Sequence, residues 1–294
     1  MSGVRFEVDF EVTDPNIPVL YPDPLMSKGS LMLMDLSNTY VAQPASIVAG
    51  ALIQNVAWET AKYAMGHAGS QNDYAAIVDI TVGYSGSVGK AEITPKKGIH
   101  ALISQVNHTT PSTQRFNIYL PAPIREYLVA NQNHEFYVSQ WKTNTREAAA
   151  GIDFADVVLA FSTTAVYLTF ANPISASLAN GQTSKRRNGL ARTLGNSFKN
   201  IAFNRSNSST AVSNITSSGN CIMASGGGLQ AYQASNYANK VGSYVTYRVY
   251  IEDLTVSGRT YEQVDALDYA MYQQAFAEGG KFHGDTFTDP ATLP

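Results

Sequence analysis

The sequence contains a single cysteine, Cys221, and few histidines. One thiol excludes an intramolecular disulfide and a cysteine-based zinc site. The five histidines are scattered, and no two of them lie four residues apart, the spacing that places two imidazoles on one helix face for a metal. We therefore expect no metal site and no cofactor. Stability is expected to come from packing and from oligomerisation.

Charge is also scarce. Charged residues make up 15% of the chain, against about 25% in an ordinary globular protein. The formal net charge is -3 and the pI is near 5.9. Such a chain has no general electrostatic field that would attract nucleic acid or an anionic membrane surface, so we expect neither as a partner.

A membrane-spanning or secretory segment is not expected. The stretch from Val157 to Ser184 carries no charge and is long enough to span a bilayer. Polar residues and Pro173 interrupt it, however, and "VVLAF" and "AVYLTF" within it are typical of two buried strands. The N-terminus lacks the basic start and apolar run of a secretory signal.

Prolines are concentrated near the start of the chain, where "DPNIPVLYPDPL" holds four in twelve positions. Proline lacks a backbone donor and does not continue a helix or a central strand. We interpret residues 1–60 as an extended N-terminal arm that anchors the protein. In this region "LMLMDLS" predicts a short strand, and "PASIVAGALIQNVAWETAKYAM" is compatible with both a strand and a helix.

Short runs of β-branched and aromatic residues recur from Tyr74 onward, separated by Gly, Asn, Ser and Pro. The runs are "YAAIVDITVGY", "GIHALISQV", "RFNIYL", "HEFYVSQWKT", "DVVLAF", "AVYLTF" and "SYVTYRVYIEDL". This spacing is typical of a β-sandwich, which we place at residues 61–258. The basic sequence "SKRRNGLAR" lies in a polar stretch, residues 179–219. Such a segment suits an acidic neighbouring subunit or phosphates, but we interpret it as an exposed loop.

Two helices are predicted between and after the strands. One begins at Pro123 in "PIREYLVANQ", where proline suits the first turn. The second follows Arg259, because Thr260 and Gln263 form a capping box. Spacings of three and four place apolar residues on one side of this helix and two aspartates on the other: Tyr261, Val264, Leu267, Met271 and Ala275 against Asp265 and Asp268. The helix and a Gly-rich tail form the last part of the chain, residues 259–294.

The best candidates for binding are aromatic and charged residues on strand faces. Alternation in "SYVTYRVYIEDL" sorts residues by face: Arg248, Tyr250 and Glu252 on one, Val245, Tyr247, Val249 and Ile251 on the other. Alternation in "HEFYVSQWKT" places Tyr137 and Trp141 together. Such a face is solvated, buried in an interface or used for a ligand, and Trp141 either packs into the core or offers a platform for a glycan. The candidate glycan- or partner-binding residues are Tyr137, Trp141, Arg248, Tyr250 and Glu252.

Two segments carry a resemblance to a known group of proteins. They are "GSLMLMDLSNTYVAQPASIVAGALIQNVAWE" and "YRVYIEDLTVSGRTYEQVDALDYAMYQQAFAEGGKFHGDTFTDP". With them the chain resembles virion proteins of tailed bacteriophages that carry a concanavalin A-like jelly-roll domain. The resemblance implies a mainly β fold, a two-sheet concanavalin A-like β-sandwich displayed on a virus particle. The extended N-terminal arm and the C-terminal amphipathic helix predicted above complete the expected fold.

The same superfamily includes glucanases, whose active strand carries two catalytic glutamates around a central aspartate. The nearest match here is "GIDFADVV", in which Asp153 fits the central carboxylate. Gly151 and Ala155 stand where the two glutamates belong, and retaining hydrolysis needs that pair about 5 Å apart. Asp156 is one position out of phase. We therefore assign no catalytic residue and expect no enzymatic activity.

Taken together, these features favour a non-enzymatic structural component of a bacteriophage particle, a head decoration or tail protein located in the virion and assembled in the host cytoplasm. Its expected partners are other virion proteins, such as major capsid or tail proteins, and copies of itself in a homo-oligomer for which three-fold symmetry is considered. The alternative is a receptor-binding adhesin of the virion that binds a host-surface glycan.

Overall fold

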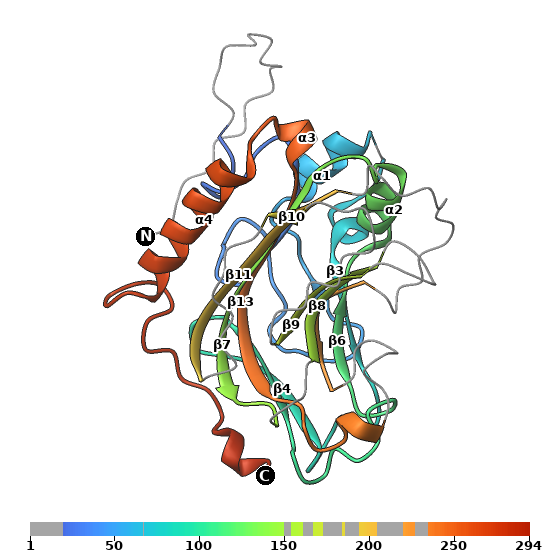
Figure 1. Cartoon of the computed structure of the whole chain (residues 1–294), viewed down its shortest axis with the longest axis vertical. Coiled ribbons are helices and arrows are strands. Elements are labelled where there is room, and N and C mark those ends of the chain that lie inside the picture. The colour runs from blue at the N-terminus through green and yellow to red at the C-terminus, as the bar shows by residue number, and fades with distance from the viewer. Residues whose placement is uncertain are drawn as a thin grey trace.

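A computed structural model of the chain describes residues 20–66, 68–149, 154–160, 167–172, 184–185, 194–204, 220–226 and 235–294. Two antiparallel sheets lie face to face in the manner of a β-sandwich (Figure 1). Sheet A contains β1 (Ser30–Met34), β4 (Gly89–Ile93), β5 (Ile99–Ile103), β7 (Phe136–Arg146), β10 (Ser184–Lys185), β11 (Gly195–Phe203) and β13 (Ser243–Asp253). Its order is β10-β11-β7-β13-β5-β4, with β1 also paired to β13.

Sheet B faces sheet A and contains the remaining strands of the described residues. These are β2 (Leu52–Ile53), β3 (Ala76–Ile80), β6 (Phe116–Tyr119), β8 (Phe154–Ala160), β9 (Tyr167–Asn172) and β12 (Cys221–Ser225), in the order β2-β3-β6-β12-β8-β9. The α-helices are α1 (Trp58–Met65), α2 (Ala122–Ala130), α3 (Leu254–Ser257) and α4 (Tyr261–Phe276), and short 3-10 turns lie at Gln71–Tyr74, Ser235–Tyr237 and Pro290–Thr292.

The mainly β prediction is confirmed. Each of the seven runs of β-branched and aromatic residues contains a strand, namely β3, β5, β6, β7, β8, β9 and β13. The helix predicted from Pro123 is α2, with proline in its first turn. The uncharged stretch from Val157 contains the end of β8 and all of β9. None of the helices in the described residues is long and apolar enough to cross a membrane.

The main hydrophobic core lies between the two sheets. Phe116 and Ile118 of sheet B and Val138, Val249 and Ile251 of sheet A belong to one cluster of buried side chains. Alternation along each strand points these residues inward, and their neighbours point to the other side of the sheet. On β7 the predicted alternation is confirmed, because Phe136 and Val138 face the core while Tyr137 belongs to a cluster on the outer face of sheet A.

Along β13 the predicted alternation is correct over only half of the strand. The pairing of β13 with β7 shifts register between Thr246 and Arg248. Val249 and Ile251 therefore face the inter-sheet core, whereas Val245 and Tyr247 contribute to a different cluster on the outer face. A β-bulge adds one residue to one strand and reverses the phase of the side chains that follow, a feature that alternation alone does not reveal.

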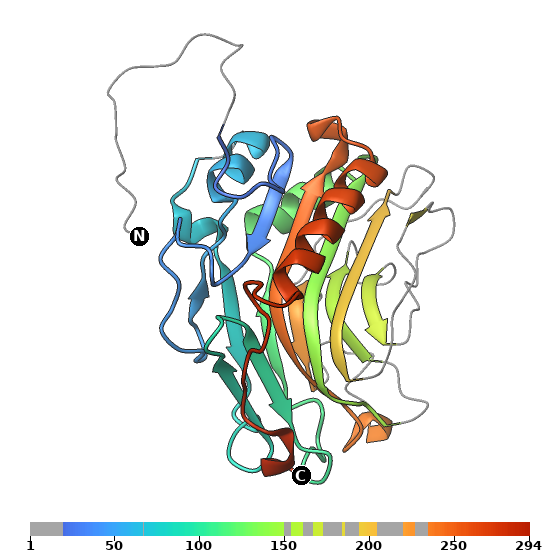
Figure 2. The same ribbon diagram turned by 90° about the vertical axis from the view of Figure 1, so that its left-hand side faces the viewer.

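The boundary drawn at residue 60 does not separate an arm from the sandwich. β1 pairs antiparallel with β13, with Leu33 opposite Tyr250 and Met34 opposite Val249 (Figure 2). All five residues of β1 are buried. The described part of the predicted arm, residues 20–60, therefore belongs to the folded body, while residues 1–19 lie outside the described residues. The ambiguous stretch that follows β1 contains both a short strand, β2, and a helix, α1.

Helix α4 covers the outer face of sheet A (Figures 1 and 2). Its capping box forms as predicted, with the Thr260 side chain accepting from the Gln263 amide and the Gln263 side chain accepting from the Thr260 amide. The placement predicted for Asp268 is wrong: it is fully buried against the sheet, whereas Leu267 is 36% exposed. Hydrogen-bond partners on the sheet stabilise Asp268 in this position, as described below.

The C-terminal tail, residues 277–294, continues across the same face of sheet A (Figure 2). The ring of Phe287 lies 5.0 Å from that of His100 on β5. The backbone amide of Thr288 donates to Glu92 on β4 at 2.8 Å. α4 and the tail cover the outer face of the central strands, so β13 and most of β7 are buried on both sides of sheet A.

Candidate functional site

All five predicted binding residues lie together on the outer face of sheet A, on β7 and β13. Their exposed fractions are 0% for Tyr137, 2% for Trp141, 2% for Arg248, 0% for Tyr250 and 0% for Glu252. The predicted platform for a glycan or partner is therefore not an open surface. It is buried because α4, the tail and the N-terminal segment, residues 20–29, cover it.

These residues belong to a buried polar layer between sheet A and its covering segments. We use this name for the set Asp23, Asp35, Tyr137, Trp141, Arg248, Tyr250, Glu252 and Asp268, none of which is more than 6% exposed. Charged side chains are rarely buried without a partner, because removing an ion from water is unfavourable unless another charge or hydrogen bonds replace the solvent. The partners of each charge therefore show what holds the covering segments in place.

Arg248 binds the N-terminal segment through a bidentate ion pair. Its Nη1 and Nη2 atoms donate to the two carboxylate oxygens of Asp23 at 2.9 and 2.5 Å, and Nη1 lies 3.6 Å from Asp35. The guanidinium stacks over the ring of Trp141 at 4.8 Å. Burial alone would lower the pKa of Arg248, but the hydrogen bonds and charge of Asp23, with the charge of Asp35, raise it above its usual value. Arg248 therefore stays charged and joins residues more than two hundred positions apart.

Glu252 forms a second ionic contact at the end of β13. Arg259, just before α4, donates through Nε to Oε1 at 2.9 Å and through Nη2 to Oε2. The hydroxyl groups of Ser27 and Tyr250 donate to the same carboxylate at 2.8 and 2.9 Å. Tyr250 also contacts the Ser30 hydroxyl at 2.7 Å. Glu252 thereby holds together the N-terminal segment, β13 and the entrance to α4.

Asp268 attaches the middle of α4 to the sheet. It accepts one hydrogen bond from the Tyr137 hydroxyl and one from the indole Nε1 of Trp141, each 2.8 Å long. Burial raises the pKa of Asp268 above its usual value, although the charge of Arg248 and the hydrogen bonds from Tyr137 and Trp141 act in the opposite direction. Burial and the nearby Asp268 charge also raise the pKa of Tyr137 well above its usual value, which keeps the hydroxyl protonated as a donor.

The tail is joined to the same layer through Asp35, which follows β1. Lys281 donates to Asp35 at 3.0 Å and is 44% exposed at its side chain, so this ion pair lies at the edge of the layer. Each carboxylate of the layer is thus bonded to another segment of the same chain. The arrangement fixes the N-terminal segment, α4 and the tail on sheet A, a structural task that needs no bound ligand.

The residues compared with a glucanase strand lie partly outside the described chain. Gly151 and Asp153 are not among the described residues, and Ala155 and Asp156 fall in β8. Among the residues that the structure describes, no group of three or more His, Cys, Asp or Glu side chains is placed to hold a metal ion.

Two predicted residues, Trp141 and Arg248, also line a pocket of about 340 Å³ beside α4. We call it the α4 pocket. Its other lining residues are Asp23, Met271, Gln274, Ala275, Gly279, Gly280 and Lys281. The indole of Trp141 is stacked by Arg248 on one side and met edge-on by Tyr272 and Phe282. Any ligand in this pocket would therefore meet the polar groups of Gln274 and Lys281 rather than an open aromatic face.

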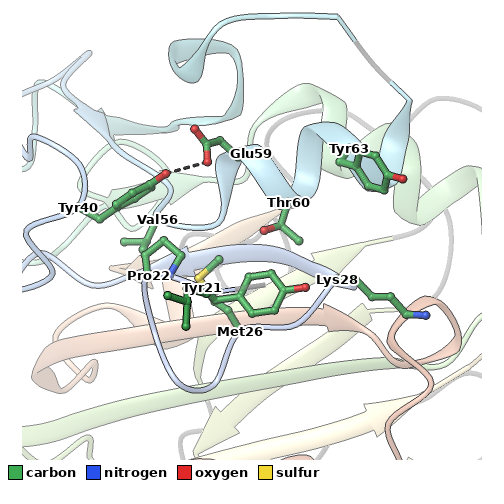
Figure 3. A pocket seen from close by; sticks show the side chains of 10 residues that line it. Tyr21, Pro22, Met26, Lys28, Tyr40, Val56, Glu59, Thr60 and Tyr63 are labelled. Atoms are coloured by element: carbon green, nitrogen blue, oxygen red, sulfur yellow. Dashed lines mark hydrogen bonds between the residues drawn. The ribbon is translucent and has the colours of Figure 1, made fainter. Parts of the chain in front are cut away.

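A larger cavity of about 530 Å³ lies between the N-terminal segment and α1 (Figure 3). We call it the α1 groove. It is lined by Leu20, Tyr21, Pro22, Met26, Lys28, Tyr40, Val56, Glu59, Thr60 and Tyr63. Most of its wall is apolar, and the Tyr40 hydroxyl donates to the Glu59 carboxylate at 2.7 Å across one end. Its volume lies within the range of roughly 300–1,000 Å³ that is typical of ligand pockets.

The α1 groove was not predicted from the sequence. Two of its residues are unusually exposed for apolar side chains: Leu20 is 94% and Tyr63 is 85% exposed. A signal was present in α1, where Tyr63 follows Glu59 by four residues and so shares its solvent-facing side. The helix itself was left ambiguous, and for that reason this face could not be recognised.

Comparison with known proteins does not assign the site. No protein-family model, no curated protein and no solved structure matches the chain. The resemblance to bacteriophage virion proteins stays a prediction that rests on the two sequence segments, and the functional argument depends on the residues described above.

Proposed function

We propose that the chain is a non-enzymatic structural component of a bacteriophage particle, a head decoration or tail protein built on a jelly-roll sandwich of the concanavalin A-like type. The observation that supports this most is the buried polar layer. Arg248 and Glu252 both bind the N-terminal segment, and Asp268 binds α4 to the sheet. Charged groups that serve catalysis or binding need access to a ligand, whereas these hold the chain's own segments together.

The part of the chain that joins the particle is, in this proposal, shorter than the arm predicted from the sequence. Residues 20–60 contribute β1, β2 and buried charges to the sandwich, so residues 1–19 are the segment available for anchoring. The α1 groove begins at Leu20, where this segment joins the folded body. Assembly is proposed to involve this region together with the sandwich and α4, in a homo-oligomer and with other virion proteins.

The proposal is tested by locating the protein on virus particles. Antibodies raised against the folded chain should label particles purified from a lysate of the cells that produce it, at a regular position on the head or the tail. A protein that is abundant in the lysate but never co-purifies with particles, and labels none of them, would contradict the proposal.

A deletion series adds a matched control to this test. Removal of residues 1–19 should leave a folded domain, because all of the contacts described above involve residues from 20 onward. This domain should no longer join particles, because it lacks the proposed anchoring segment. Removal of residues 1–40 should prevent folding, because it deletes β1, Asp23 and Asp35. Normal incorporation of the shorter deletion would remove the anchoring role.

A second candidate function is a receptor-binding adhesin that recognises a host-surface glycan. The observation that favours it is the α4 pocket, in which Trp141 and Arg248 lie beside Gln274 and Lys281. Hydroxyl-rich ligands suit such a mixture of amide, ammonium and glycine backbone groups. A glycan array should then show binding that Gln274→Ala weakens and that the exposed control Val82→Ala leaves unchanged. An array without binding for either the oligomer or the monomer would rule this candidate out.

A further inference from the structure

The α1 groove presents apolar side chains to solvent at the point where the described chain begins. Leu20 and Tyr63 are 94% and 85% exposed, and Tyr40 is 42% exposed. Isolated exposed apolar residues are ordinary, but several around one concave, mostly apolar cavity mark an interaction site. In Figure 3 the N-terminal segment supplies Tyr21 and Met26 on one side of this cavity, and α1 supplies Tyr63 on the other.

A matching apolar strip is encoded in residues 4–12, "VRFEVDFEV". The apolar residues alternate without exception with charged ones: Val4, Phe6, Val8, Phe10 and Val12 against Arg5, Glu7, Asp9 and Glu11. In an extended backbone successive side chains point to opposite sides, so one side of this segment would be entirely apolar and the other charged. A segment of this kind buries its apolar side only against another surface.

Residues 13–19 join this apolar strip to the groove, and their length and stiffness bear on whether the strip binds the groove of its own chain or that of another copy. Residues 13–19 contain Pro15 and Pro18, which favour an extended backbone of about 3.1 Å per residue, or about 22 Å in all. Leu20, at the end of this connection, forms part of the groove wall. Binding in the groove at its own base would require this connection to reverse direction, which an extended proline-containing backbone disfavours, so the groove of a neighbouring copy is the better match.

We propose that residues 4–12 of one copy bind in the α1 groove of a second copy, so that neighbouring subunits exchange their N-terminal segments. The valine and phenylalanine side chains lie against Tyr21, Met26, Val56 and Tyr63. The charged side, with Arg5, Glu7, Asp9 and Glu11, points away from the groove and stays in solvent. This inference rests on the proposed function, because it specifies how the anchoring segment joins one subunit to the next.

Cysteine cross-linking tests the exchange directly. The native thiol of Cys221 is fully buried, and burial raises its pKa, so it does not compete under mild oxidation. One preparation of the full chain carries Val8→Cys and a second carries Thr60→Cys in the groove. Mixing and oxidising them should give a covalent dimer that contains one chain of each kind. The matched control replaces Thr60→Cys by Val82→Cys, which is 96% exposed in the native chain and does not line the groove.

Two outcomes would overturn the proposal. In the first, the mixture with Val82→Cys cross-links as efficiently as the mixture with Thr60→Cys. In the second, a chain carrying both Val8→Cys and Thr60→Cys closes on itself at high dilution and forms no dimer at any concentration, which would show that the segment binds its own groove.

A peptide measurement checks the groove as the binding surface without relying on assembly. A fluorescent peptide of residues 1–19 should bind the chain that lacks residues 1–19, and Phe6→Asp with Phe10→Asp in the peptide should weaken binding by at least about tenfold. Tyr63→Glu in the groove should weaken it similarly, whereas Val82→Glu should not. Equal binding to the Tyr63→Glu and Val82→Glu chains would contradict the assignment of the groove.

The two proposals fail in distinguishable ways. Exchange between copies without label on any particle would refute the virion role and leave the subunit contact standing. Labelled particles combined with a cross-linking result that does not depend on Thr60→Cys would refute the exchange alone.

Discussion

Both faces of sheet A contain fully buried side chains, but only on the outer face do ion pairs accompany the apolar contacts. On the inner face, Val138, Val249 and Ile251 pack against sheet B through apolar contacts. On the outer face, Arg248 and Glu252 are also no more than 2% exposed, yet they form ion pairs and hydrogen bonds to specific segments. Apolar contacts are non-directional, so the inner face accepts any well-shaped apolar partner.

The outer face is more selective about what covers it. A buried charge requires its counter-charge at a defined position, and a missing partner is strongly unfavourable. Asp23 and Arg259 supply those counter-charges from segments at opposite ends of the described chain. The comparison indicates that the inner face drives collapse, whereas the outer face determines which parts of the chain are fixed on the sheet.

The largest effect is expected from removing a charge on the outer face. Arg248→Met keeps much of the side-chain volume but leaves Asp23 and Asp35 buried beside an apolar group. Breaking a buried ion pair in this way costs about 3–5 kcal/mol of the free energy of unfolding, which urea denaturation measures. Adding Asp23→Asn should recover part of the loss, because the unpaired charge is then removed. A loss below about 1 kcal/mol would mean that the ion pair behaves as a surface pair.

On the inner face the largest change should come from a cavity. Ile251→Ala removes buried methyl and methylene groups from the core between the sheets and is expected to cost about 2–5 kcal/mol. Its effect should be nearly the same across pH and salt concentration, since no charge is involved. If the stability loss of Ile251→Ala depended on salt concentration as strongly as that of Arg248→Met, the distinction between the two faces would be wrong.

A smaller effect is expected at the start of α4, where the covering helix begins. Thr260→Ala removes the side chain that accepts from the Gln263 amide. Loss of an N-cap costs about 1 kcal/mol, and thermal or urea unfolding should show this with the rest of the fold unchanged. Thr260→Ser, which keeps the hydroxyl, should stay close to the native stability. If both variants lose the same amount, the capping contact does not contribute.

The smallest effect concerns the pH dependence of the outer face. The pKa of Asp268 is higher in the folded chain than in an unfolded chain, so folding favours its protonated form. Its contribution is present at low pH and is lost as the pH rises from the unfolded pKa of about 3.9 through the raised folded pKa. The stability of Asp268→Asn relative to the native chain should therefore increase between pH 3 and pH 7. Thr260→Ala, on the same helix without an ionisable group, should show no such trend.

The strands that the sequence predicts well are those whose own residues carry the signal. "HEFYVSQWKT" and "SYVTYRVYIEDL" contain β-branched and aromatic residues in alternation, and both form long strands of sheet A. β11 was missed because it lies in a polar stretch that was interpreted as an exposed loop. In the structure its Lys199 is fully buried, and Phe198 packs against Tyr269 of α4 with ring centres 5.4 Å apart. β11 is stabilised as a strand by its contacts with β7 and α4, which are distant in the sequence, so its own residues do not predict it.

For the candidate site, the sequence predicted which residues share a face but not that this face is buried. Arg248, Tyr250 and Glu252 were correctly grouped on one face, since alternation is a local property. Their burial could not be predicted, because it depends on Asp23 and Arg259, which approach only in the folded chain. Sequence patterns identify which side chains share a surface, and the covering segments determine whether that surface is accessible.

The position of β13 has a consequence for the synthesis of the protein. β13 pairs with β7 along one edge and with β5 and β1 along the other, so it is the common neighbour of strands that are made much earlier. At about 5–20 residues per second, the ribosome needs on the order of ten to forty seconds to proceed from β1 to the start of β13. During this time the apolar sequence of β1 lacks the strand with which it pairs in the structure, so sheet A is completed only after β13 has been made.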